Sequence, residues 1–168
     1  PAVDQSQDIL VGLILANGLF AMYEMAMVSS SQVRLKQRQG TDPRAVNAAV
    51  ELSESPNRLL STVQVGITLV GVFSGAVGGV TLADDLAPLL AKLPFLDNAG
   101  APAVALVFVT LAITYCSLVI GELIPKRLAM GNPEAISINF ARFFRALSWL
   151  TSPVIRLLSA STNLGLRI

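Results

Sequence analysis

The sequence predicts an all-α integral membrane protein, a dimer whose protomer has three transmembrane helices and a juxtamembrane helix lying in the cytoplasmic interface. Of its 168 residues, 53% are hydrophobic and only 14% are charged, whereas a soluble domain carries about 25% charged residues. The low share of charged residues indicates a protein surrounded by lipid, because a surface that faces lipid does not need charged side chains. Three segments have the roughly 20 mostly apolar residues that a membrane-crossing helix needs. They are residues 9–28, 59–80 and 104–124.

The positions of the basic residues orient these three spans. Five basic residues lie between the first and second spans and six follow the third, whereas only Lys92 lies between the second and third. Cytoplasmic loops of membrane proteins are enriched in Lys and Arg. We therefore expect the protein in the cell's inner (plasma) membrane, with its N-terminus outside and its C-terminus in the cytoplasm. The leader before the first span has no basic residue, so that span is expected to be retained rather than cleaved as a signal peptide.

A fourth apolar stretch, residues 135–158, is interrupted by Arg142, Arg145 and Pro153. Carrying two arginines across the bilayer costs several kcal/mol each, so we expect this stretch to lie in the cytoplasmic interface. The alternative is a fourth span that is kinked at Pro153. Between the first two spans, a shorter helix is predicted to begin at Pro43 and to end at Ser55.

The composition excludes several classes of function. The chain has no His, one Cys and a net charge of +1. The commonest catalytic base and metal ligand is therefore missing, a disulfide framework or thiolate metal site is impossible, and no nucleic-acid partner is indicated. No nucleophile–base pair or phosphate-binding loop is visible, so the sequence does not predict an enzyme.

Two carboxylates, Glu24 and Glu122, lie inside predicted spans, where ionisable groups are costly and are usually functional. Both are near the cytoplasmic ends of spans that run in the same direction, so they are expected at similar depth in the inner half of the membrane. Neutral polar groups on the same three spans are Asn17, Ser29, Ser61, Thr62, Gln64, Thr68, Tyr115 and Ser117. Carboxylate, hydroxyl and carbonyl oxygens suit a hard cation, Mg²⁺ first among the candidates.

The residues around Glu122 strengthen this prediction. Pro125 has no amide hydrogen and its ring clashes with the carbonyl of Gly121, so that oxygen is freed from the helical ladder. Broken helices of this kind form ion sites in transporters. We therefore expect a metal site made by Glu122 and the Gly121 carbonyl, with Glu24 as a second ligand or gate.

Ser29 and Thr68 are the predicted neutral ligands of this site. Structural alternatives stay open for each residue. Glu122 can instead pair with Lys126 one turn on, Glu24 can pair with an arginine such as Arg34 or Arg58, and the threonines Thr68, Thr110 and Thr114 can bond the carbonyls of their own helices.

The second span carries Gly71, Gly75 and Gly79 at intervals of four residues. Such stripes let helices approach closely. Because three spans are too few to enclose a pathway, we expect a homodimer, although the stripe can equally pack within one protomer.

Three ordered segments resemble the transmembrane domain of the CNNM/CorC family, and most closely its bacterial haemolysin-related CorC subgroup. They are Asn17–Ser29, Leu60–Gly71, and Ile113–Tyr115 followed by Ile120–Lys126 with the sequence IGELIPK. The resemblance implies a dimer of three-span protomers with a cytoplasmic juxtamembrane helix. It also implies that a cytoplasmic CBS-pair domain, which binds ATP and is absent from this chain, follows in the full-length protein.

The same resemblance implies Mg²⁺ export, with Na⁺ entry as a suggested driving force, and places Gly121, Glu122 and Pro125 next to the ion. The chain departs from the family where many relatives have a serine at the position of Ala21, and where animal proteins have an asparagine near Ile67 or Gly71. These departures leave fewer oxygens from the first two spans.

Two functional hypotheses follow. The first is transport of a divalent cation through an oxygen-lined site centred on Glu122 and open to the cytoplasm. The second is a membrane anchor and ion sensor that does not transport and that signals to the cytoplasmic CBS domain.

Overall fold

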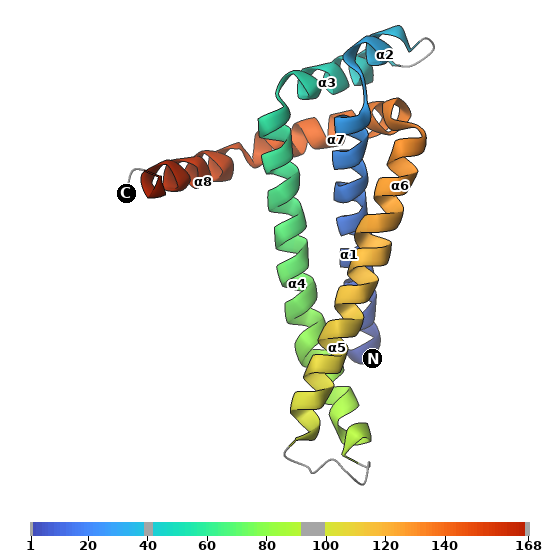
Figure 1. Ribbon diagram of the computed structural model, residues 1–168, viewed down its shortest axis with the longest axis vertical. Coiled ribbons are helices and arrows are strands. Elements are labelled where there is room, and N and C mark those ends of the chain that lie inside the picture. The colour runs from blue at the N-terminus through green and yellow to red at the C-terminus, as the bar shows by residue number, and fades with distance from the viewer. Residues whose placement is uncertain (1, 39–41, 92–99, 167–168) are drawn as a thin grey trace. The chain divides into compact units, whose positions relative to one another are not determined.

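The computed structural model describes residues 2–38, 42–91 and 100–166, and every regular element in those ranges is a helix (Figure 1). In chain order the helices are α1 (Ala2–Ser29), α2 (Gln32–Gln37), α3 (Pro43–Glu54), α4 (Pro56–Leu90), α5 (Ala101–Leu118), the π-helix η1 (Val119–Leu123), α6 (Ile124–Gly131), α7 (Pro133–Leu150) and α8 (Ser152–Gly165). The predicted all-α class is confirmed.

Three helical stretches are long and apolar enough to cross a membrane. They are Gln5–Ser29, Pro56–Leu89 and Ala101–Gly131. Large apolar side chains along them are exposed, among them Phe73 on α4 and Phe108 and Leu111 on α5. Contiguous apolar surface of this kind is unfavourable in water and is expected of helices that face lipid. The prediction of three spans is therefore confirmed.

The C-terminal end of the second span differs from the prediction. Helix α4 continues through Pro88 to Leu90, ten residues beyond its expected end at residue 80. Pro88 removes the donor for the carbonyl of Asp84, but Asp84 is exposed, so this carbonyl has access to solvent. The second helical stretch is therefore longer than predicted, and residues 92–99 lie outside the described ranges.

The stretch expected as one interfacial helix, residues 135–158, is divided between α7 and α8 at Thr151. Pro153 lies in the first turn of α8. A proline is tolerated in a first helical turn but cannot continue a helix that precedes it, because it lacks the amide hydrogen. In contrast, α3 has the predicted bounds, and the side chain of Asp42 caps it by accepting from the amide of Arg44 at 2.9 Å.

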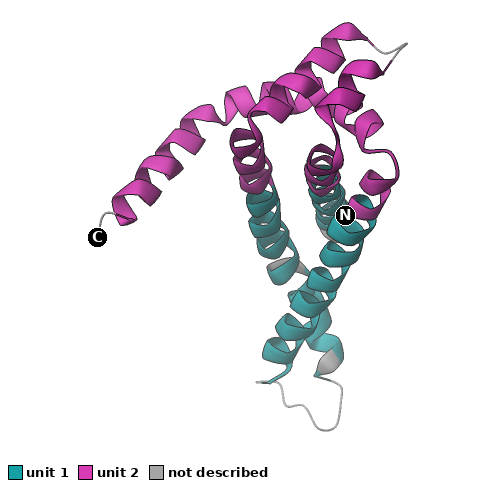
Figure 2. Ribbon diagram, turned by 45° about the horizontal axis from the view of Figure 1, so that its top comes forward, with its two compact units in different colours: residues 1–19, 67–125 teal, residues 20–66, 126–168 magenta. Residues whose placement is uncertain are grey.

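The chain divides into two compact units, shown in teal and magenta in Figure 2. Unit 1 comprises residues 1–19 and 67–125, and unit 2 comprises residues 20–66 and 126–168. In unit 1, the end of α4 packs against α5 through Ala83, Ala105 and Val109. Small residues at this contact let the two helices approach closely, which is how membrane helices commonly associate.

Unit 2 has a core of its own, built mainly by α2, α3 and α7. Its members are Leu35, Ala48, Ala49, Val50, Ile138 and Ala141. Phe144 extends this core toward the end of α1, where its ring stacks on Tyr23 with the centroids 3.8 Å apart and meets the edge of Phe20 at 5.6 Å. Both Phe144 and Tyr23 are fully buried.

Ion pairs join α7 to α2 and to the start of α3. Arg34 donates to Glu134 at 2.6 Å, and Arg142 pairs with Asp42. Partial burial alone would raise the pKa of the Glu134 carboxyl. Backbone amides and the Arg34 guanidinium, by hydrogen bonding and by charge, outweigh that effect and hold the pKa below its ordinary value of 4.5.

Replacing Phe144 by alanine tests the packing of unit 2. Removing a fully buried aromatic ring leaves a cavity, so Phe144→Ala should lower the free energy of unfolding by about 3–5 kcal/mol. Phe143→Ala, which removes a half-exposed ring from the next position, should cost clearly less. Thermal unfolding of the two variants in detergent micelles measures the difference. Equal losses would show that the stacked rings are not part of the stabilising core.

The pH dependence of stability tests the Arg34–Glu134 pair. Since the pKa of Glu134 is lower in the folded chain, the unfolded chain binds more protons near the ordinary value of 4.5. The contribution of Glu134 to stability is therefore complete at neutral pH and is lost as the pH falls from above 4.5 through the lower folded pKa. Glu134→Gln should flatten this part of the stability curve, whereas Glu54→Gln, at an exposed position in α3, should leave it unchanged.

Candidate functional site

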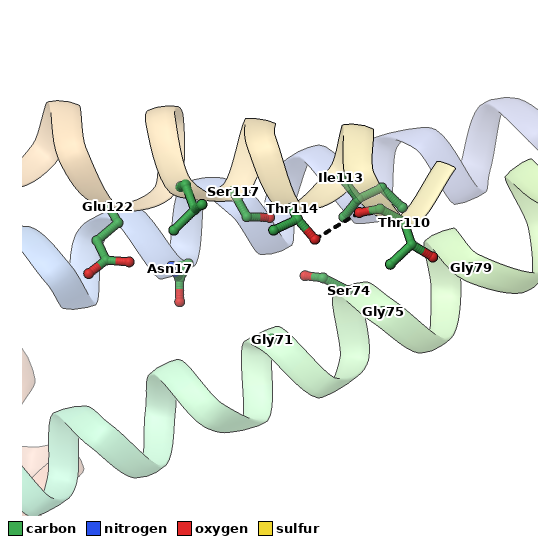
Figure 3. Close-up of a pocket in the computed structure, with 11 residues that line it drawn as sticks. Asn17, Gly71, Ser74, Gly75, Gly79, Thr110, Ile113, Thr114, Ser117 and Glu122 are labelled. Atoms are coloured by element: carbon green, nitrogen blue, oxygen red, sulfur yellow. Dashed lines mark hydrogen bonds between the residues drawn. The ribbon is translucent and has the colours of Figure 1, made fainter. Parts of the chain in front are cut away.

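A pocket of about 260 Å³ opens in unit 1 between the middle of α1, the middle of α4, α5 and η1 (Figure 3). We call it the Asn17–Glu122 pocket. It is lined by Asn17, Gly71, Ser74, Gly75, Gly79, Thr110, Ile113, Thr114, Ser117, Leu118 and Glu122. Of these, Glu122 is the one ionisable group, so the pocket joins a single carboxylate to neutral oxygens in a helical region expected to face lipid.

Glu122 lies on a π turn. In η1 the amide of Ile124 donates to the carbonyl of Val119, five residues back, in place of the usual four. Single π turns inside α-helices frequently occur at functional sites. Pro125 gives the reason for the irregularity, because it has no amide hydrogen to donate to Gly121. The sequence predicted a disturbed helix at this position, and the structure has one.

The carbonyl oxygen of Gly121 accepts a hydrogen bond from the side-chain amide of Asn17 at 3.0 Å. The oxygen that Pro125 leaves without its helical donor therefore has a protein donor from α1, on one of its two lone pairs. This close approach favours glycine. A Cβ on Gly121 would lie 3.2 Å from the carbonyl of Ile14, and one on Gly18 would lie 3.1 Å from the ring of Pro125.

The other atom of the same amide group has no partner. Asn17 Oδ1 is buried and accepts no hydrogen bond from the described residues. An unsatisfied buried acceptor costs about 1–3 kcal/mol, and a cation or its water would relieve that cost. In Figure 3 the side chains of Asn17 and Glu122 point into the same space. Asn17 is the one side-chain amide of the first predicted span; the sequence places it among the polar groups of the spans but does not predict it as a ligand.

Hydroxyl groups continue the pocket along α5. Thr110, Thr114 and Ser117 lie on one face of the helix, with Ser74 of α4 opposite (Figure 3). Thr114 donates to the carbonyl of Thr110 at 2.7 Å, as expected for a membrane threonine. Ser74 is 4% exposed and was not predicted. Its place between Gly71 and Gly75 is the feature that could have indicated it.

The glycine stripe gives the pocket its space. A Cβ on Gly71 or Gly75 would meet no atom within 4 Å, and one on Gly79 would meet only Leu106, at 3.9 Å. Close approach occurs instead at Gly78, where a Cβ would lie 2.2 Å from the end of the Ile113 side chain. Within unit 1 the stripe therefore opens room beside Ser74, and its part in a homodimer stays a prediction.

The remaining predicted residues lie elsewhere. Thr68 belongs to unit 1 but is exposed and does not line the pocket. Glu24, Ser29 and Lys126 belong to unit 2. Ser29 is half-buried, and its carbonyl accepts from Arg34 at 3.4 Å.

Glu24 pairs with Lys126, whose Nζ lies 3.5 Å from Glu24 Oε2. The basic partner of Glu24 is therefore Lys126 and not one of the arginines of the structural alternative, since Arg34 bonds Glu134 and Arg58 donates to the carbonyl of Ser148. Glu24 also lines a hollow of unit 2, of about 570 Å³, between α4 and α8. Nothing in the local sequence distinguishes Lys126 from the arginines as its partner.

Comparison with known proteins gives one family. A sequence-family model, the cyclin M transmembrane N-terminal domain, matches residues 9–168. The chain is 42% identical to UPF0053 protein sll0260 of Synechocystis over 156 residues, which are 93% of this chain and 35% of that protein. It is 26% identical to the UPF0053 inner membrane protein YfjD of Escherichia coli over 149 residues, 89% of this chain and 31% of that protein.

A further relative is the polyamine export protein of Haemophilus influenzae, with 22% identity over 159 residues, 95% of this chain and 36% of that protein. The chain thus spans about a third of the length of the curated relatives it matches.

A pair of glycine substitutions tests the crossing at Gly121. Gly121→Ala should destabilise the protein, because the added methyl group would press on the carbonyl of Ile14 and on the Asn17 amide. Gly75→Ala has open space around it and should be neutral or stabilise by up to about 1 kcal/mol, since alanine favours helix. Thermal unfolding in the same detergent compares the two. A tolerated Gly121→Ala would contradict the crossing.

Proposed function

The chain belongs to the cyclin M transmembrane (CNNM) family, and from that premise we propose that it transports a divalent cation, Mg²⁺ first, out of the cell through the Asn17–Glu122 pocket. The observation that carries this proposal is the buried Asn17 Oδ1, which has no donor among the described residues and lies in the same pocket as the Glu122 carboxylate. A cation held by the Glu122 carboxylate would supply the partner that the amide oxygen lacks.

The pocket suits a partly hydrated ion. Mg²⁺ requires an octahedron of oxygens and releases its water reluctantly, so it is usually held by one or two carboxylates and several waters. A volume of about 260 Å³ has room for an ion and several waters, each of which occupies about 30 Å³ in the liquid. Ala21 offers no side-chain oxygen, so in this proposal the hydroxyls of Ser74 and Ser117 hold the waters.

Each predicted residue has a role in this proposal. Glu122 is the anionic ligand, Asn17 Oδ1 is a neutral one, and Gly121 with Pro125 sets the π turn that presents them. Glu24 acts as a second ligand or gate, with the Lys126 ammonium occupying its carboxylate when no cation is present. Ser29 and Thr68 serve as neutral ligands along the path, and Na⁺ is the proposed coupling ion.

The proposed assembly is a homodimer in the inner membrane, with the N-terminus outside and the C-terminus in the cytoplasm. Helices α7 and α8 lie in the cytoplasmic interface and lead to a CBS-pair domain in the full-length protein. The exposed Phe143 and Leu157 support this placement, since they are unfavourable in water and suit the acyl boundary.

A linear organic di-cation is the second candidate substrate, and the length of the pocket favours it. Thr110 and Glu122 both line the pocket and are twelve residues apart, about 18 Å along a helix at 1.5 Å per residue. An extended diamine such as putrescine is shorter than this and fits within the pocket, with one ammonium at Glu122 and its methylene chain along the glycines. The relative named a polyamine export protein supports this candidate.

Replacing Glu122 by glutamine tests transport. Glu122→Gln keeps the shape of the side chain and removes its charge, so Mg²⁺ efflux from loaded proteoliposomes should fall by about tenfold or more, the loss of one charged ligand. Glu54→Gln, at an exposed position in α3, is the matched control and should leave efflux unchanged. Size-exclusion chromatography confirms that both variants stay folded. Full efflux in Glu122→Gln would overturn the proposal.

Two further measurements separate the substrates and the competing role. Putrescine flux that exceeds Mg²⁺ flux, and that Glu122→Gln also removes, would identify the organic di-cation. Saturable Mg²⁺ binding without any flux in the reconstituted full-length protein would identify the ion sensor and membrane anchor instead.

A further inference from the structure

The charges of the chain are divided between its two units. Unit 2 carries eleven of the twelve basic residues and five of the eleven acidic ones, a formal net charge of +6, whereas unit 1 has one basic and six acidic residues. An excess of this size attracts anions, and at a membrane surface each Lys or Arg contributes about 1 kcal/mol of attraction to anionic lipid. Excess charge alone does not make a binding site. Whether unit 2 has one depends on how its basic side chains are placed.

Three of these arginines line one hollow of unit 2. The hollow has a volume of about 470 Å³ and lies between the end of α3, the start of α4 and α7, which meet in Figure 1. We call it the Arg58 hollow. The residues that matter here are Glu51, Ser55, Arg58, Arg142, Arg145 and Trp149. Its lining therefore has three guanidinium groups and a single carboxylate.

The arginines are positioned but still available to an anion. Arg58 donates through Nη2 to the carbonyl of Ser148 at 3.2 Å, a contact that holds its side chain and leaves other N–H groups. Arg145 lies 3.4 Å from Glu51, with both side chains about half exposed or more. Exposed ion pairs of this kind contribute about 0–1 kcal/mol, so a better acceptor displaces Glu51 at little cost.

Arg142 lies beside these two and pairs with Asp42, which is not part of the lining. The start of α4 adds to the attraction, because the first amides of a helix have no helical acceptor and carry partial positive charge. A phosphate accepts from guanidinium groups in bidentate geometry and from helix amides. The arrangement therefore fits a phosphate group.

The surroundings of the hollow indicate where that phosphate comes from. Trp149 is 76% exposed and also lines a neighbouring hollow of about 370 Å³, together with Leu150, Pro153 and Arg156. Exposed tryptophan is characteristic of the membrane interface, where its ring lies at the level of the lipid headgroups. Helix α4 begins at the same place with the second candidate span. A basic hollow and a mainly apolar one thus adjoin at an interfacial residue.

We propose that the Arg58 hollow binds the phosphate of an anionic phospholipid, with Trp149 between the headgroup and the acyl chains. The lipid would join α3, α4 and α7 at the membrane surface. This role is independent of the cation proposed for the Asn17–Glu122 pocket, because none of the residues of the hollow lines that pocket.

Trp149 itself reports on the lipid, because it is the one tryptophan of the chain. The protein is reconstituted in phosphatidylcholine nanodiscs that contain a small fraction of brominated phosphatidylglycerol or, in a parallel series, brominated phosphatidylcholine. Bromine quenches tryptophan fluorescence only at close range. Brominated phosphatidylglycerol should quench Trp149 at about tenfold lower mole fraction than brominated phosphatidylcholine, as expected for one or two charge-assisted hydrogen bonds.

Matched variants separate the hollow from general surface charge. Arg58→Gln and Arg145→Gln should each remove most of this preference, and Arg145→Gln keeps the test valid if Arg58→Gln unfolds. Arg127→Gln removes the same charge from an exposed position of α6 and should leave the preference intact. Equal quenching by the two lipids, or an equal loss in all three variants, would overturn the proposal. So would relief of the quenching by inorganic phosphate, which would assign the hollow to a soluble anion.

Discussion

The crossing of α1 over the π turn of η1 is the constraint on which unit 1 depends. Two helices separated by about a hundred residues approach there so closely that a Cβ on Gly18 or Gly121 would lie only 3.1–3.2 Å from the nearest atom. The hydrogen bond from Asn17 to the Gly121 carbonyl fixes the register of that approach. In lipid no water is available for the carbonyl that Pro125 leaves without a donor, so a partner from another helix is needed. The same bond turns Asn17 Oδ1 into the pocket.

The pocket follows from this crossing together with the missing side chains of α4. The π turn directs Glu122 beside Asn17, and Gly71 and Gly75 leave space opposite. Such a pocket costs stability, because an unsatisfied amide oxygen and an unfilled volume are both unfavourable. Structures retain such costs mainly at functional sites. Gly71 and Gly75 also weaken α4, because glycine is less favourable in a helix than alanine, although no neighbouring atom would contact a Cβ there.

The sequence predicts what depends on local chemistry. Apolar length predicted the three spans, Pro43 predicted the start of α3, and the chemistry of Pro125 predicted the irregular helix at Glu122. Partners distant in sequence were not predictable, because any of several groups would satisfy the same chemistry. Glu24 pairs with Lys126 rather than with an arginine, and the Gly121 carbonyl accepts a hydrogen bond from Asn17, 104 residues away. Ser74 belongs to the site by its register on α4, which its residue type does not reveal.

If the pocket binds a divalent cation as proposed, its charge favours passage of the ion over storage. One carboxylate neutralises half the charge of a divalent ion, and the other pocket groups, Asn17 and the hydroxyls, are neutral. An ion that keeps net charge in a region of low dielectric is held less tightly than one in a fully neutralising cage. Conduction requires this balance, since binding must be strong enough to admit the ion and weak enough to release it.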